Sequence, residues 1–479
     1  MHAASGQSRV GALNPPTSSR RRITSLLCLI VVFATAGCAT HAKQLTSIRD
    51  AYYSGQLDQA EALTVKQISK SKPDADVLKL ERAMIELSSG HPQQAERTLR
   101  EVRDRFDDFE QKDIGEGVLS LVTDDTRRAY AGEDYEKVLI RCFLALSNLM
   151  RDGSDSVPYA LQVSQKQQDI ILAGGDDAAK NPKLAYKRVA LGAYLHATVQ
   201  EATHRNYDDA ARSIQLVVNW EPGFKSGPKD LERATTGRHS APGNGVLYVF
   251  TLVGRGPFKE EKLERPTSDA LLIADRILSI TGKHSLPPTI APIKVPVVRG
   301  GHSRVSTVRV LVDGQSAGQT ETITDVGQMA VDQYKATKNQ VLARAVARRV
   351  IKKGAIYATK EAIHVDNPFV ELALDGVGVA WEATESADTR CWGLLPDKIQ
   401  VLRIELPAGQ HEISLAPLTT GSHRGPDVTR RVMIDDGRNA YMLATFPDER
   451  LVGEVLLCLN AESQLERAVP PPEASADGY

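Results

Sequence analysis

Aromatic residues and cysteine are scarce in this chain of 479 residues, and its positive and negative charges nearly balance. Aromatic residues make up 5% of the sequence, although 42% of it is hydrophobic and 25% is charged. Alanine is frequent among the hydrophobic residues, which favours helices. Because the formal net charge is only −1, no long-range positive field attracts nucleic acid, and we expect no nucleic-acid partner.

The signatures of several metal and catalytic sites are also missing. The histidines form no His-Glu-x-x-His motif and the cysteines show no zinc spacing, so we predict no cofactor and no metal. A Gly-x-Ser-x-Gly pattern does occur at Gly314–Gly318. A nucleophile elbow needs a helix after the serine, whereas strand-like, Thr-rich sequence follows here. Asp313-Gly314 is better explained as a hairpin turn.

Long apolar runs are absent apart from one short run near the N-terminus. Three arginines, Arg20–Arg22, precede the apolar stretch Leu26–Phe33, and small residues then lead to Cys38. The run is shorter than the ~20 residues of a membrane span, but this order is typical of a secretory signal peptide. The Ala-Gly-Cys ending resembles a lipobox, with Thr35 where leucine is usual. We therefore expect removal of residues 1–37 and lipidation of the cysteine.

The residue after the lipidated cysteine is Ala39 rather than the aspartate that retains lipoproteins in the inner membrane. In a Gram-negative cell this predicts an outer-membrane anchor facing the periplasm. An ordinary cleaved signal peptide is the alternative. Three cysteines then remain in an oxidising compartment: Cys142, Cys391 and Cys458. Either all three are buried free thiols, or Cys391 and Cys458 form a disulfide.

The first half of the chain carries a helical repeat. Gly55 and Gly90 are 35 residues apart, as are Ala60 and Ala95, close to the tetratricopeptide period of 34. The alanines are small enough for two helices to cross closely. Two further units follow, so we predict a tetratricopeptide-like helical repeat domain over 38–235. The alternative is an unrelated helical bundle.

From Gly245 onward the chain becomes rich in alternating β-branched and aromatic residues, which predicts strands. One long helix, or two helices broken at Gly354, is expected from Met329 to Ile363. Antiparallel hairpins are expected over 399–415 and 428–446. The predicted fold is therefore α+β and multidomain. Its domain boundary lies between Thr235 and Gly245, a mixed α/β domain covers 245–468, and a disordered tail covers 469–479.

The long helix of the second half carries a run of basic residues with no acid between them. They are Arg344, Arg348, Arg349, Lys352 and Lys353. Neighbouring like charges cost tenths of a kcal/mol per pair, so the run either is the solvated face of a packed helix or binds an anionic partner.

Several sequence blocks resemble a known family. They are Glu133–Leu139 with Leu144–Leu149, Thr324–Val326 with Arg344–Arg348, and Ala387–Trp392 with the stretch leading to Val401. These blocks are similar to those of a family of uncharacterised bacterial envelope lipoproteins with N-terminal tetratricopeptide-like repeats. The resemblance extends over most of the mature chain. It implies an envelope lipoprotein and assigns a function to Cys38 alone.

These observations predict a lipid-anchored periplasmic scaffold or adaptor. Stacked repeats form a concave surface that suits a protein or peptide partner, and we expect Arg49 and Glu86 to face this groove. The alternative is an envelope-acting hydrolase with its site in the β-rich half.

Overall fold

The computed structural model describes residues 38–116, 129–175, 177, 181–281, 286, 290–362, 386–419 and 425–458. The predicted signal peptide, 1–37, and the predicted tail, 469–479, lie outside them. The chain divides into two compact units, Met1–Ser47 and Ile48–Tyr479. Of the first unit the structure describes only the beginning of helix α2 (Cys38–Tyr53). All contacts below belong to the second.

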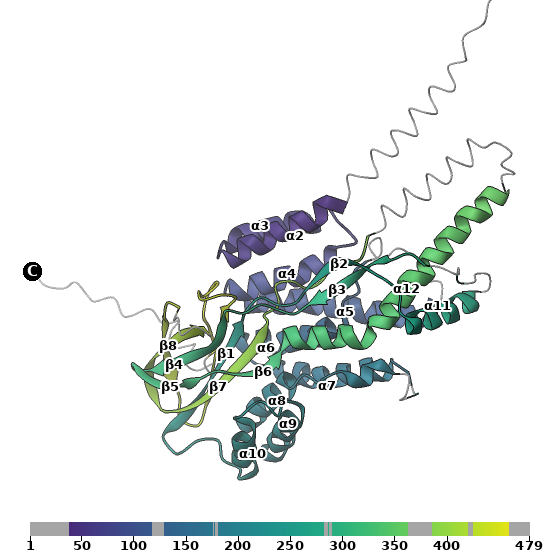
Figure 1. Ribbon diagram of the computed structural model, residues 1–479. Helices are drawn as coiled ribbons and strands as arrows, with labels where there is room; N and C mark the ends of the chain where they lie inside the picture. The colour runs from purple at the N-terminus through teal and green to yellow at the C-terminus, as the bar shows by residue number, and fades with distance from the viewer. Residues whose placement is uncertain are drawn as a thin grey trace, which may run out of the picture. The chain divides into compact units, whose positions relative to one another are not determined.

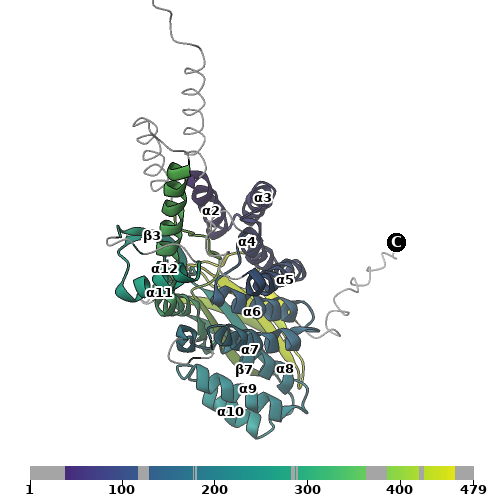
Figure 2. The same cartoon turned by 90° about the vertical axis from the view of Figure 1, so that its right-hand side faces the viewer.

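Helices fill the first half of the second unit. After α2 come α3 (Leu57–Ile68), α4 (Ala75–Ser88), α5 (Pro92–Glu116), α6 (Asp134–Arg151), α7 (Ser156–Leu172), the 3-10 helix η3 (Pro182–Ala185), α8 (Leu191–Glu201), α9 (Tyr207–Trp220) and α10 (Gly227–Thr235). From α3 to α10, each α-helix packs against the next one along the chain (Figures 1 and 2). Most of these helices are joined by short connections, which make neighbours in the chain the natural partners for each apolar face.

Strands dominate the second half. They are β1 (Asn244–Val253), β2 (Phe258–Glu264), β3 (Ile293–Arg299), β4 (Val305–Val312), β5 (Gln315–Gln319), β6 (Glu321–Asp325), β7 (Lys398–Pro407), β8 (Gly409–Thr419), β9 (Val428–Ile434), β10 (Asn439–Phe446) and β11 (Leu456–Cys458), with helices α11 (Ser268–Thr281) and α12 (Val326–Ala362). They form a five-stranded sheet in the order β11-β10-β1-β7-β6, a four-stranded sheet β5-β4-β8-β9 and a pair β2-β3. Strands β1 and β10 are parallel. The mixed α+β class is confirmed.

The five-stranded and four-stranded sheets share one hydrophobic core. Val249 of β1 and Met442 of β10 belong to the same buried cluster as Val310 of β4 and Ile413 of β8. On the opposite face of β1, Tyr248 lies against Tyr194 of α8, with ring centroids 6.2 Å apart. Because β1 is covered on both faces, nearly all of its residues are buried, which matches its continuous apolar sequence.

The two predicted hairpins over 399–415 and 428–446 are wrong, although their strands exist. Strand β7 pairs with β1 and β6, whereas β8 pairs with β4 and β9. Strand β10 belongs to the five-stranded sheet, whereas β9 belongs to the four-stranded sheet. Each short turn therefore leads the chain from one sheet to the other. Alternating strands joined by a few residues suit either geometry, because stacked sheets lie only about 10 Å apart. At the turn from β7 to β8, Gly409 has a φ of +141°, a backbone conformation that glycine adopts readily.

The boundary predicted between Thr235 and Gly245 lies inside a single compact unit. Buried polar side chains join the two sides of it. Arg233 of α10 forms two hydrogen bonds with Glu201 of α8, at 2.6 and 3.1 Å. The hydroxyl of Tyr248 in β1 donates to the same carboxylate at 3.1 Å, and Arg403 of β7 lies 3.7 Å from it. Two strands of the sheet thus share one charge cluster with the helices.

The alanines at the repeat positions are buried as predicted: Ala60, Ala95 and Ala210 are at most 1% exposed. We expect Ala95→Leu to lower the free energy of unfolding by about 1–3 kcal/mol, because the larger side chain overpacks the contact between α4 and α5. Urea denaturation of the variant measures this. The control is Ala62→Leu on the exposed side of α3, expected within about 0.5 kcal/mol of the parent. Equal midpoints for the two variants would contradict the assignment.

Candidate functional site

An irregular segment before β7, residues 387–397, contacts α2, α4 and α6 and contains a turn at Gly393 and Leu394. It is called the inserted segment below. Glu81 of α4 is fully buried, and its two carboxylate oxygens accept the backbone N–H groups of Gly393 at 3.0 Å and Leu394 at 2.7 Å. Arg49 of α2 donates to the same carboxylate at 3.0 Å. Burial opposes the charge of Arg49, but Glu81 beside it raises the pKa of the guanidinium above its ordinary value. A buried carboxylate thus holds two main-chain amides and one cation, which satisfies most of its acceptor sites.

A second buried glutamate holds the next residue of the inserted segment. Glu136 of α6 accepts the backbone N–H of Trp392 at 2.7 Å and the hydroxyl of Tyr130 at 2.5 Å. Burial, and the charge of Glu133 nearby, raise the pKa of Glu136 above its ordinary value. The Trp392 ring is itself buried, with its centroid 5.5 Å from that of Phe143. The helices therefore recognise main chain and one large aromatic side chain together.

Further contacts hold the inserted segment at Arg390 and Gly393. Arg390 donates to the carbonyl of Pro73 at 3.0 Å and to the carboxylate of Asp388 at 2.7 Å. The hydroxyl of Tyr53 donates to the carbonyl of Gly393 at 3.0 Å. Over this stretch, the protein's own chain covers the helices α2, α4 and α6.

The prediction that Arg49 and Glu86 line an open groove is wrong. Arg49 binds the inserted segment, donating also to the carbonyl of Cys391 at 3.3 Å. Glu86 is 2% exposed and accepts from Thr98 at 2.8 Å. Helical periodicity is compatible with a buried position for both residues. Glu86 is buried among neighbouring helices, where it contacts Arg82 and Thr98, whereas Arg49 contacts a segment about 340 residues further on, which its local sequence does not indicate.

The three remaining cysteines are buried and none of them is in a disulfide, so the bridge considered between Cys391 and Cys458 is not formed. Cys391 lies in the inserted segment beside Arg49, whereas Cys458 ends β11 beside the carbonyl of Arg151. Burial raises the pKa of Cys458 to about 11 and that of Cys391 above its ordinary value. Thiols with raised pKa values are poor nucleophiles at neutral pH.

The Gly-x-Ser-x-Gly pattern is a β-hairpin, as predicted. Asp313 and Gly314 have φ angles of +50° and +80°, which is the geometry of a two-residue hairpin turn. Strand β5 pairs back onto β4 and contains Ser316 on its exposed side. The serine therefore lies within a strand rather than at the start of a helix.

The basic run lies on α12, whose apolar side packs as predicted. Val346 and Leu342 belong to a buried cluster with residues of α11 and β3. Arg344 is exposed and Arg348 is half-buried, while Arg349 donates to the carbonyl of Pro292 at 3.0 Å. The side chains of Lys352 and Lys353 lie outside the described residues. Binding of an anionic partner here stays a prediction.

An open cleft lies where β1 and β10 end. Because these strands are parallel, their carboxyl ends reach the same edge of the sheet, where ligands commonly bind in open sheets. The cleft has a volume of about 420 Å³. Its lining residues are Tyr53, Arg255, His302, Arg304, Asp448, Glu449, Arg450 and Val452. One helix, two strand ends and the β3–β4 connection thus build it together.

Contacts among the lining residues fix one wall of this cleft. Arg255, just after β1, exchanges two backbone hydrogen bonds of 2.9 Å with His302. Its guanidinium lies 4.2 Å from the ring centroid of Tyr53 and 2.5 Å from the carboxylate of Asp448. A stacked and ion-paired arginine is a rigid element. The sequence does not indicate this cleft, because charged residues after two distant strands meet only if those strands pair in parallel.

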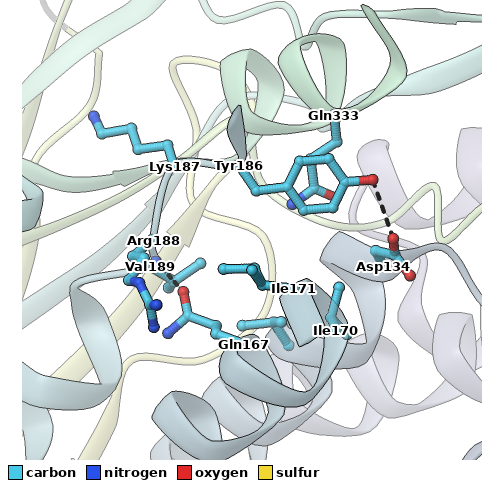
Figure 3. A pocket seen from close by; sticks show the side chains of 10 residues that line it. Asp134, Gln167, Ile170, Ile171, Tyr186, Lys187, Arg188, Val189 and Gln333 are labelled. Atoms are coloured by element: carbon cyan, nitrogen blue, oxygen red, sulfur yellow. Dashed lines mark hydrogen bonds between the residues drawn. The ribbon is translucent and has the colours of Figure 1, made fainter. Parts of the chain in front are cut away.

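A second pocket is too small for a ligand. Figure 3 shows it between α6, α7, the η3 connection and α12, with Tyr186 donating to Asp134 at 3.1 Å. Its volume is about 10 Å³, room for about one water molecule. Gln167 Nε2 and Gln333 Oε1 are buried there without a hydrogen-bond partner among the described residues. A single water is the occupant that this polar lining suits.

Over the described ranges, no cluster of three or more His, Cys, Asp or Glu side chains is placed to hold a metal ion. Within the same ranges no helix is both long and apolar enough to span a membrane. The chain matches no protein-family model, no curated protein and no solved structure.

Proposed function

We propose that the protein is a lipid-anchored scaffold of the bacterial cell envelope, attached through Cys38 to the outer membrane and facing the periplasm. Its helical half would be a divergent tetratricopeptide-like array that binds a protein or peptide partner. Consecutive packing of α3 to α10 supports the array, as does complete burial of Ala60 and Ala95 at the repeat positions.

Hydrogen bonds between the helices and the inserted segment are the main support for the binding role. Glu81 and Glu136, from two different helices, accept the backbone amides of three consecutive residues of a non-helical segment. These residues are Trp392, Gly393 and Leu394, and the last two lie in a turn. Hydrogen bonds to main-chain groups also hold peptides in many binding proteins, with side-chain pockets adding selectivity. Here the buried Trp392 fills such a pocket. A partner on this surface would compete with the inserted segment.

Competition is tested by loosening the inserted segment. Arg390→Lys keeps the charge but loses the planar fork that contacts Asp388 and Pro73, so crosslinking in intact envelopes should capture more of a defined partner than the parent does. Arg212→Lys is the control, because Arg212 forms an exposed ion pair with Asp209. Identical crosslinked species and yields for both variants would argue against a partner in this groove.

Lipid attachment is tested at Cys38. Replacement by serine removes the thiol that the lipid modifies, so we expect Cys38→Ser to move from the membrane fraction to the soluble periplasm and to lose labelling by a palmitate analogue. Cys28→Ser, in the apolar part of the signal peptide, is the matched control and should keep both properties. Full membrane retention and labelling of Cys38→Ser would refute the anchor.

The hydrolase alternative depended on a catalytic group in the β-rich half. The Gly-x-Ser-x-Gly pattern does not supply that group, because it forms the β4–β5 hairpin.

A further inference from the structure

We propose that the cleft at the carboxyl ends of β1 and β10 binds a small phosphate-bearing ligand, with the phosphate group held by Arg304 and Arg450. Both arginines line the cleft and both are exposed. They come from separate connections, one before β4 and one after β10, and the fold brings them to the same opening.

The other charged residues of the cleft determine which cations are available to bind a ligand. Arg255 is engaged by Asp448 and by the ring of Tyr53, so it shapes the wall and neutralises one acid. Arg304, Arg450 and the exposed His302 are then available, opposed by the single carboxylate of Glu449. Guanidinium groups match the geometry of phosphate oxygens and bind them through paired hydrogen bonds.

The size and charge of the cleft limit the ligand class. A volume of about 420 Å³ lies in the range of small-molecule sites. Glu449 would repel a polyanion, which disfavours an extended run of phosphates. A ligand with one phosphate group, such as a lipid headgroup or a soluble phosphoester, fits both limits.

Two sources could supply this phosphate. If Cys38 carries a lipid, an assumption that rests on the proposed function, only 15 residues separate the anchor from Tyr53 at the cleft. Fifteen residues span at most about 54 Å in any conformation, so the cleft stays near the membrane surface and its headgroups. The other source is a soluble phosphate compound of the same compartment.

The test compares two double variants of the mature chain carrying Cys38→Ser, which removes the lipid from the measurement. Arg304→Ala with Arg450→Ala removes the proposed phosphate contacts. Arg97→Ala with Arg205→Ala removes two exposed arginines of the helical half and changes the net charge equally. The probes are inorganic phosphate, followed by calorimetric titration, and vesicles of phosphatidylglycerol in phosphatidylcholine, followed by co-sedimentation. Thermal melting checks that both variants fold.

We expect the parent and the Arg97/Arg205 variant to bind phosphate alike, and the Arg304/Arg450 variant to bind it at least about tenfold more weakly. Parallel loss of vesicle binding would identify headgroups as the source, while loss of phosphate binding alone would identify a soluble ligand. Equal affinity of the two double variants, or no binding of either probe to the parent, would overturn the proposal. Partner capture and Cys38 labelling are measured separately, so failure of the scaffold function would be recognised independently.

Discussion

Replacing Glu81 with glutamine is expected to lower the free energy of unfolding by about 3–5 kcal/mol, the usual effect of breaking a buried charged contact. The amide keeps one acceptor oxygen but places an NH₂ group where the other oxygen accepts a hydrogen bond. Either Gly393 N–H or Leu394 N–H then loses its acceptor, and Arg49 loses its buried counter-charge. An unsatisfied buried donor carries the full cost of desolvation. Urea denaturation followed by circular dichroism measures the loss.

The matched control for this change is Glu101→Gln. Glu101 pairs with Lys79 at 2.5 Å, but its side chain is 62% exposed, and surface pairs of this kind contribute about 0–1 kcal/mol. The two variants alter the same functional group on neighbouring helices and differ in burial and in contact with the inserted segment. If both unfold at the same urea concentration, the inserted segment does not hold the helices as the structure indicates.

Replacing Arg233 with methionine is expected to lower the free energy of unfolding by a similar amount, about 3–5 kcal/mol. Methionine preserves much of the side-chain length but removes the cation that lies between Glu201 and Asp230. Both carboxylates are almost fully buried, and Arg233 contacts them at 2.6 and 2.5 Å. Arg403 remains 3.7 Å from Glu201 and compensates only part of the charge. The variant should melt well below the parent.

This second change also tests how the helical and sheet parts are joined. The linker around Thr236–Arg238 is exposed, so a protease is still expected to cut first near the predicted boundary, but the cut parent should stay associated. Arg233→Met should release the fragments at lower denaturant. Arg212→Met is the control, since its pair with Asp209 is exposed on both sides. Separation of the parent fragments without denaturant would show that the charge cluster does not join the two parts.

The sequence by itself determined the local character of most elements. The 35-residue repeat placed buried alanines at Ala60 and Ala95, and the basic-apolar-small order near the N-terminus predicted the anchor at Cys38. Alternating β-branched residues identified β1, β4 and β7 to β10, and Asp313-Gly314 identified the β4–β5 turn. These features depend on residues close together in the chain, where periodicity and turn chemistry act directly.

Only the tertiary structure decided how distant elements pair. The same alternating pattern suits a hairpin or a crossing between stacked sheets, so β7 and β8 were assigned to one sheet although they lie in two. The parallel pairing of β1 with β10 creates the cleft, yet almost 200 residues separate these strands. Glu81 and Glu136 resemble surface residues of helices until the inserted segment, about 255 to 315 residues further on, covers them. Burial by a remote segment changes the role of a charged side chain without leaving a trace in its local sequence.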